Sequence, residues 1–389
     1  MLQKSQLSDI VSAGTFTANG QVFHQAFLGF AMIVFGTEHE QSYITDQGYA
    51  THGLALKQLN QTLCDPKCYT RDDVILSVAT LAILECVVPT GTKNYLSHMI
   101  GLERLLELRD PRSHCAPESC ELYKSVRHMI LFASLRTGKP SILAREEWKT
   151  ILRANCTDEE LQEQDLYDVL ADCTILAAQR DKTSANLELD PERATHQQDK
   201  LKRRALDLLS HLRAWRKRWD SDESNSYCET SAALAGVEPT QKALVDDSPT
   251  THTIFKFSNE SAAVMFMLYN TTLIFVLRIL ASLSLQNLDI HSKQQPLLQD
   301  AGYSDDLWNY TKHEYLAAEG LAALEVCRCI PYYAIRKSRL DTDCSPVVHW
   351  AVTTARATLC GNESTAGRWV MDLLKDKGRE VVAKALWAA

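Results

Sequence analysis

The residues best suited to chemistry lie in the stretch TIFKFSNESAAVMFMLYN, residues 253–270. Lys256 precedes a predicted helix, and Asn259 and Glu260 fall in its first turn. Free backbone N–H groups at a helix start favour anions, and carboxylate and amide oxygens are ligands that magnesium prefers. The group therefore has the composition of a site for an anion held with a metal ion, with Lys256 as the fixed cation.

Further along the same predicted helix, amide and apolar residues recur at three- and four-residue spacing and so share one face. They are Asn259, Ala263, Met267, Asn270, Ile274 and Leu277. This pattern is typical of a cavity with one wet end, and we expect Met267 and Ile274 to line it. The alternative is ordinary: Asn259 caps the helix, Asn270 is hydrogen-bonded in the core, and Lys256 is solvated. For any single residue, we favour this second interpretation.

A second unusual residue is Glu85, a carboxylate in the middle of an apolar helical run. Asp73 lies about three turns earlier on the same predicted helix, so the two carboxylates are not expected to share a metal ion. A buried carboxylate needs a partner, and His98 and Arg127 are the candidates. We favour a structural polar pair and keep metal ligation by Glu85 as the alternative.

Helical periodicity continues along nearly the whole chain, which predicts an all-α fold. Predicted helices occupy 21–36, 49–63, 72–88, 97–110, 120–138, 151–180 (two helices), 200–219 and four apolar stretches after residue 252. Polar segments at 182–199 and 220–251 are predicted to be surface loops. The chain thus divides into an N-terminal segment at 1–20, a first helical half at 21–181, loops flanking a basic helix (200–219) at 182–251, and a second helical half at 252–389.

Composition narrows the class of function. The 389-residue chain has a formal net charge of −8 and a pI near 5.9, so it offers no overall basic field for nucleic acid or anionic lipid. None of its 12 cysteines forms a C-x-x-C pair and no cleavable leader opens the sequence, which favours thiols in a reducing compartment. The longest apolar run contains Asn270 and Arg278, so we expect a buried helix and no membrane span.

The order of motifs between residues 54 and 148 resembles the fungal-specific transcription factor domain. That domain is a large helical region C-terminal to a zinc cluster in many fungal regulators. The matching positions are Leu54 to Leu63, Asp65, Pro66, Arg71 to Asp73, Glu85, His98, Gly101, Leu105 to Arg109, Pro111, Arg127, Pro140 to Ala144 and Trp148. The resemblance implies a large all-α domain over nearly the whole chain.

The sequence departs from that family's pattern at its start. A zinc cluster needs closely spaced cysteine ligands, whereas the first cysteine here is Cys64 and the predicted helices begin at residue 21. No other base-reading motif stands in the sequence. The basic face of helix 200–219 is the candidate for phosphate contact, with Trp215 and Trp219 on the face that a core would need. We expect no structural zinc and no specific DNA binding by this chain alone.

A second resemblance connects this pattern with a small group of atypical fungal terpene cyclases, the humulene synthases of tropolone sesquiterpenoid pathways. It implies a class I-type lyase that ionises farnesyl diphosphate, with two Mg²⁺ ions, to a humulene-like sesquiterpene. Lys256 would be catalytic. Diphosphate and metal would be bound by Asn259, Glu260 and Asn270. The DDxxD signature of ordinary class I cyclases is absent from the sequence.

Two hypotheses from different classes follow. The first is a magnesium-dependent sesquiterpene cyclase of fungal secondary metabolism, located in the cytoplasm. The alternative is a zinc-finger-less regulator of the transcription factor type, located in the nucleus. It would act by protein–protein interaction, as a homo- or hetero-oligomer. The sequence favours the cyclase, because the regulator's means of reading a promoter is missing from these residues.

Overall fold

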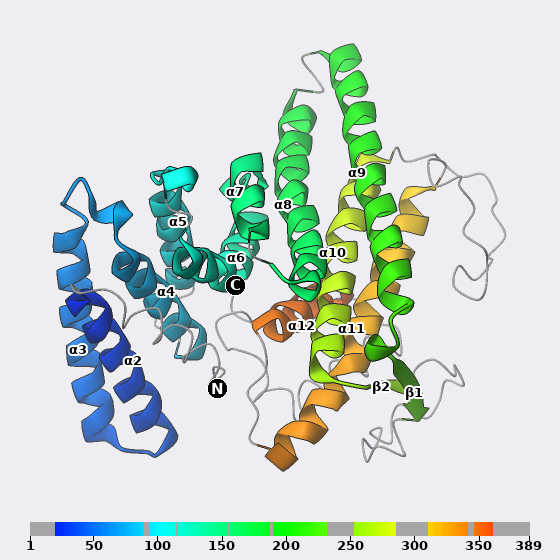
Figure 1. The fold of residues 1–389 in the computed structure, drawn as a ribbon. Coiled ribbons are helices and arrows are strands. Elements are labelled where there is room, and N and C mark those ends of the chain that lie inside the picture. Colours follow the sequence, from blue (N-terminus) through cyan, green and yellow to red (C-terminus); the bar gives the residue numbers. More distant parts are fainter. Residues whose placement is uncertain are drawn as a thin grey trace.

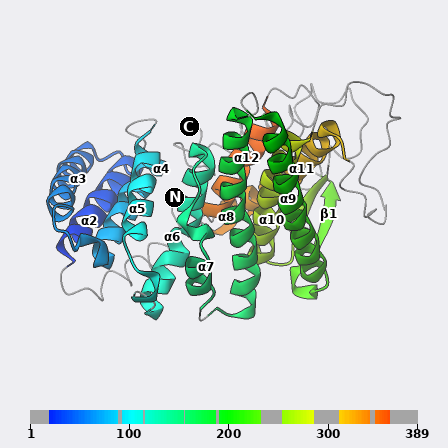
Figure 2. The same ribbon diagram turned by 90° about the horizontal axis from the view of Figure 1, so that it is seen from above.

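The protein is described by a computed structural model that covers residues 20–88, 93–113, 116–154, 156–186, 190–231, 253–284, 310–340 and 346–360. The predicted all-α fold is confirmed (Figure 1). The helices are α2 (Gln21–Glu38), α3 (Ser42–Thr62), α4 (Asp72–Val87), α5 (Asn94–Glu107), α6 (Pro117–Thr137), α7 (Glu146–Arg153), α8 (Asp158–Ala185), α9 (Pro191–Asp220), α10 (Glu260–Leu283), α11 (Lys312–Leu340) and α12 (Pro346–Leu359). Figures 1 and 2 show a row of helices that begins with the α2–α3 hairpin at one end and reaches α9 and α11 at the other.

The centre of the larger end is α10, which packs against α8, α9, α11 and α12. By length and composition α10 is apolar enough to cross a membrane, yet 78% of its most apolar window is buried inside the protein. Its apolar surface is therefore covered by neighbouring helices, as predicted. The buried apolar cluster extends from Val22 to Leu359, so the two predicted helical halves share one core.

The predicted loop at 182–199 is wrong. α8 continues to Ala185, and α9 already begins at Pro191. The side chain of Asp190 accepts a hydrogen bond from the backbone N–H of Arg193, and proline suits the first turn because its N–H would have no helical partner there. The adjoining ends of α8 and α9 project beyond the other helices (Figure 1). These ends of α8 and α9 are helical although they lack the continuous apolar face on which the sequence prediction relied.

The predicted loop at 220–251 is wrong in its first part. Strand β1 (Tyr227–Ser231) pairs antiparallel with β2 (Thr253–Phe257), with Tyr227 opposite Phe257. The Tyr227 ring also packs edge-on against Phe255 and against Phe266 of α10, at centroid distances of 5.1 and 5.2 Å. Aromatic packing on the core thus stabilises a hairpin that is too small to be stable alone. Residues 232–251 of the predicted loop lie outside the described residues.

The α2–α3 hairpin is held by an unusually close approach of two helices. A Cβ atom added to Gly29 would lie 2.9 Å from the backbone nitrogen of His52, and one added to Gly48 would lie 2.8 Å from that of Ile33. Gly36 is similarly enclosed, 2.4 Å from the Thr45 hydroxyl. Glycine therefore permits contact between the two backbones along the length of the hairpin.

Candidate functional site

Lys256, Asn259 and Glu260 lie around the start of α10. Lys256 is exposed on β2, opposite Cys228. The side chain of Asn259 caps α10 by accepting a hydrogen bond from the backbone N–H of Ala262 at 2.8 Å. Its amide group also donates to the backbone oxygen of Ser224 at 2.8 Å. In this structure the oxygen of the Asn259 side chain thus caps α10, and its NH2 group holds the turn that precedes β1.

Asn270 lies far from that group. It follows Asn259 by eleven positions, about 16 Å along an α-helix, so the two amides cannot ligate one ion together. The Asn270 side chain is 3% exposed and donates to the backbone oxygen of Phe266 at 2.9 Å. Met267 and Ile274 are fully buried in the core. The cyclase roles of these residues stay predictions.

Glu85 faces histidines from two other helices. It is 3% exposed on α4, and the Asn94 amide approaches its carboxylate at 3.5 Å. Burial lowers the pKa of His52 on α3 and of His98 on α5, and the nearby charge of Glu85 opposes both shifts. The predicted proximity of Glu85 to His98 is therefore present, in a cluster that also includes His52.

Arg127, the other candidate partner of Glu85, is used elsewhere. It pairs with Glu163 and donates to the Gln164 side chain at 2.9 Å. Among the described residues, no group of three or more His, Cys, Asp or Glu side chains has the proximity needed for a metal ion.

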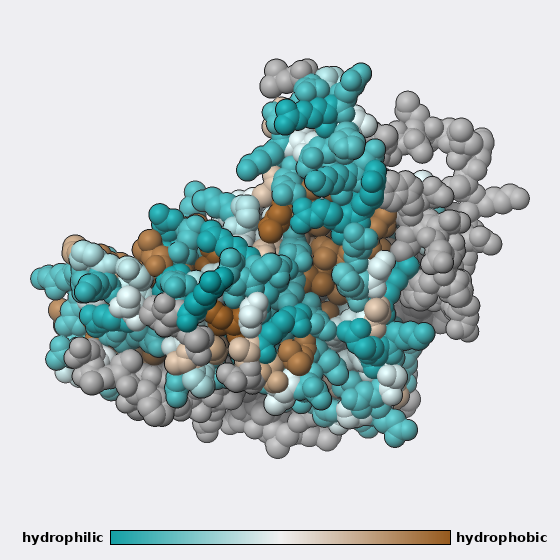
Figure 3. All heavy atoms as spheres, turned by 45° about the horizontal axis from the view of Figure 1, so that its top comes forward, coloured by the Kyte–Doolittle hydropathy of each residue, from teal (hydrophilic) through white to brown (hydrophobic). Residues whose placement is uncertain are grey.

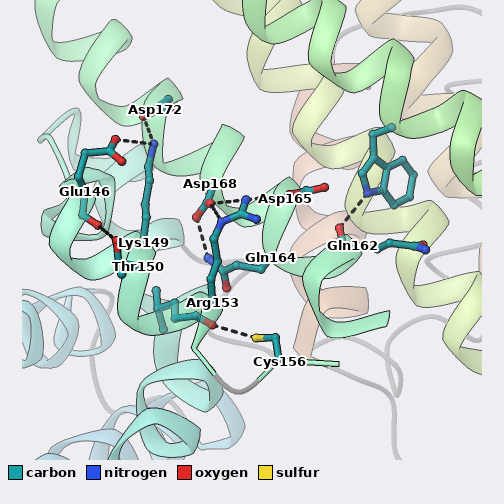
Figure 4. Close-up of polar contacts among 12 residues, drawn as sticks. Glu146, Lys149, Thr150, Arg153, Cys156, Gln162, Gln164, Asp165, Asp168 and Asp172 are labelled. Carbon is teal, nitrogen blue, oxygen red and sulfur yellow. Dashed lines mark hydrogen bonds and ion pairs between the residues drawn. The ribbon is translucent and has the colours of Figure 1, made fainter. Parts of the chain in front are cut away.

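A polar network that the sequence analysis missed joins α7 to α8 (Figure 4). Arg153 contacts Asp165 and Asp168, each at 2.7 Å. Gln164 also donates to Asp168 at 2.7 Å. Burial raises the pKa of Asp168, while the hydrogen bond from Gln164 and the charge of Arg153 oppose the rise. Each member of the network has a partner within the protein, which indicates a structural role.

The same network extends from α8 to α9 and fixes which face of α9 is turned to the core. The indole N–H of Trp215 donates to the backbone oxygen of Gln162 at 2.8 Å, and Arg218 contacts Asp165 at 3.2 Å. Trp215 and Trp219 are 3% and 1% exposed. The prediction that these tryptophans face the core is thus confirmed, and the basic residues are left on the outer side of the helix.

The outer side of α9 is the candidate functional site. Arg193, Lys200, Arg203 and Lys217 are exposed there, and none of the four makes an ion pair with another described residue. The projecting ends of α8 and α9 are hydrophilic on the face shown in Figure 3. An exposed basic surface on a chain of net charge −8 is suited to contact with an acidic surface.

Comparison with known proteins now places the chain. Residues 19–302 match the family described as fungal specific transcription factor domain. Because the match covers most of the sequence, the chain belongs to this family. The expected resemblance to the fungal-specific transcription factor domain is thus confirmed. The sequence is also similar to Uncharacterized protein AN5342 of Emericella nidulans, with 26% identity over 133 residues. That alignment covers 34% of this chain and 28% of the relative. No solved structure matches the chain.

Proposed function

We propose that this chain acts in transcriptional regulation through protein–protein contacts, and that it does not itself read DNA bases. The observation that carries the proposal is membership of the fungal specific transcription factor domain family over residues 19–302. The partner makes the contact with DNA in this proposal, and the helical domain supplies surfaces for the partner. A nuclear location follows from the same role.

The outer side of α9 supports an acidic protein surface as the partner. Its exposed arginines and lysines are spread over a 30-residue helix, so several carboxylates of a partner can be bound in parallel. Charge complementarity of this kind increases association rates and specificity more than affinity. The ion pairs of the buried Arg127 and the half-buried Arg153 with α8, and the pair of Arg218 with Asp165, hold α8 and α9 together below this surface.

A tethered reporter assay tests the proposal. The full chain is fused to an unrelated DNA-binding domain and expressed in a fungal host with a matching reporter gene. We expect a severalfold change in transcription relative to the DNA-binding domain alone. Reversing the charge of α9 with Lys200→Glu and Arg203→Glu should remove most of that change. Lys139→Glu, at an exposed lysine outside α9, serves as the matched control.

Two other outcomes would argue against this proposal. A folded, nuclear fusion that leaves reporter transcription unchanged would contradict the regulatory role. Release of a cyclic sesquiterpene from farnesyl diphosphate and Mg²⁺ by the purified chain would instead support the cyclase hypothesis. Loss of that activity in Lys256→Met, with the melting temperature unchanged, would then assign Lys256 to the diphosphate.

A further inference from the structure

Among the described residues, the main contact of α3 is with α2, and the outer face of α3 is exposed. α3 buries Gly48, Ala55 and Leu59, and its opposite side faces away from α2 at the end of the helix row (Figure 2). The exposed residues at the centre of this side are Asp46, Tyr49, Ala50, Gly53, Leu54 and Lys57. Tyr49 is 40% and Leu54 is 55% exposed. In Figure 3, apolar residues lie among hydrophilic ones over this end of the molecule.

These six residues, here called the α3 outer face, are arranged symmetrically about the midpoint between Thr51 and His52. Positions equally distant from that midpoint face each other when two copies of the helix pack antiparallel. Asp46 then faces Lys57 of the second copy. Tyr49 faces Leu54, and Ala50 faces Gly53. A two-fold interface requires this property, because each residue must suit its counterpart on an identical surface.

The α3 outer face carries one acidic and one basic residue, Asp46 and Lys57. Asp46 and Lys57 lie about 16 Å apart along the helix, too far to pair with each other. Neither makes an ion pair with another described residue. In an antiparallel pair of copies, both Asp46 side chains meet a Lys57, which gives two equivalent ion pairs.

The small residues at the centre of the α3 outer face also favour contact with a second helix. A Cβ atom added to Gly53 would meet nothing within 4 Å, so the fold of one chain does not require glycine there. Glycine at an exposed position inside a helix is less favourable than alanine by about 1 kcal/mol. Ala50 and Gly53 together leave room for the backbone of a second helix to approach closely.

We propose that two copies of this chain associate through their α3 outer faces, with the two α3 helices antiparallel about a two-fold axis. Tyr49 and Leu54 supply the apolar contact between the copies. The Asp46–Lys57 pairs fix the direction and register. This association is independent of the proposed regulatory role, since either could be present without the other.

Sedimentation equilibrium of the full chain across a micromolar concentration series tests the association. We expect a monomer–dimer equilibrium. Asp46→Lys should weaken it by about tenfold, because two attractive pairs become two repulsive ones. Lys57→Asp should weaken it similarly, and the double variant Asp46→Lys with Lys57→Asp should restore the wild-type equilibrium. Gly53→Arg should abolish the dimer by filling the space at its centre.

Asp207→Lys, at an exposed aspartate of α9, is the matched control and should leave the equilibrium unchanged. Thermal unfolding monitored by circular dichroism establishes that each variant is folded. A wild-type chain that stays monomeric throughout the series would overturn the proposal. So would a dimer that Asp46→Lys and Gly53→Arg leave intact, since the copies would then meet elsewhere. The reporter assay remains informative in either case.

Discussion

The helices α3 and α10 are of similar length but differ in how they are used. α10 is enclosed by α8, α9, α11 and α12, and its apolar residues are buried almost throughout. α3 packs mainly on α2 along one narrow face, with a smaller contact to α4. Sequence periodicity predicts both as helices, and their packing shows that α10 builds the core whereas α3 presents an exposed face.

Charged residues show the same difference. On α10, Arg278 contacts Glu319 of α11 at 2.7 Å and donates to the Thr358 hydroxyl of α12 at 2.9 Å. Arg278 therefore joins α10 to α11 and α12. On α3, Asp46 and Lys57 remain exposed and join nothing within the described residues. Arg278 thus serves the fold, whereas the exposed Asp46 and Lys57 of α3 leave their charges on the surface.

The largest expected effect of substitution is in α10. Met267→Ala should lower the free energy of unfolding by about 2–5 kcal/mol, because Met267 is fully buried and the change leaves a cavity. The matched change Leu54→Ala on α3, where the side chain is 55% exposed, should stay within about 0.5 kcal/mol. Urea unfolding at low protein concentration measures both. Equal effects would break the comparison.

A smaller effect is expected where α3 contacts α2. Gly48→Ala should destabilise the protein by about 1–3 kcal/mol, since the new methyl group would press on the backbone of Ile33. The helices of the hairpin would have to separate. The same urea titration applies, and an unchanged midpoint would show that the hairpin tolerates a wider spacing.

Gly53→Ala, five positions later on α3, should have the opposite sign. Alanine meets no neighbour there and reduces the conformational freedom of the unfolded chain, so stability should rise by about 0.5–1 kcal/mol. Thermal unfolding of the dilute monomer measures the gain. A loss of stability would mean that the chain already uses the space at Gly53.

The cluster of Glu85 with His52 and His98 should add a modest pH dependence. Burial lowers the pKa of both histidines below their ordinary value of 6.5, so the unfolded chain binds protons more readily than the folded one. The free energy of unfolding should therefore fall as the pH is lowered through 6.5. His98→Gln should flatten this slope. His196→Gln, at an exposed histidine of α9, should leave the slope unchanged. An equal change of slope in the two variants would show that the cluster does not cause the pH dependence.

Local sequence signals predicted the features that depend on one element. The helical periodicity, the inward tryptophans of α9 and the enclosure of α10 each follow from spacing within a single helix. The β1–β2 hairpin was missed because its strands are separated by residues 232–252 and are joined by aromatic packing on α10. The junction of α8 and α9 was missed because polar helix ends resemble a loop.

The candidate site and the exposed surfaces could not be predicted from residue spacing alone, because they depend on how the helices pack together. The sequence analysis grouped Lys256, Asn259 and Glu260 at the start of one helix with Asn270 further along it, but the rise along the helix separates Asn270 from the others. The pairing of Arg153 with Asp165 and Asp168 depends on the packing of α7 against α8. The symmetry of the α3 outer face is visible in the sequence, yet its significance depends on knowing that this face is exposed.

Cross-linking between copies tests the use of the α3 outer face most directly. One full-length chain carries Ala50→Cys, a second of different mass carries Gly53→Cys, and the two are mixed and mildly oxidised. We predict a disulfide between the two new thiols, identified by peptide mass. A mixture of Lys200→Cys and Arg203→Cys chains, with the same spacing on α9, should give none. Equal cross-linking in both mixtures, or none at α3 while the mixed chains still dimerise, would contradict the account.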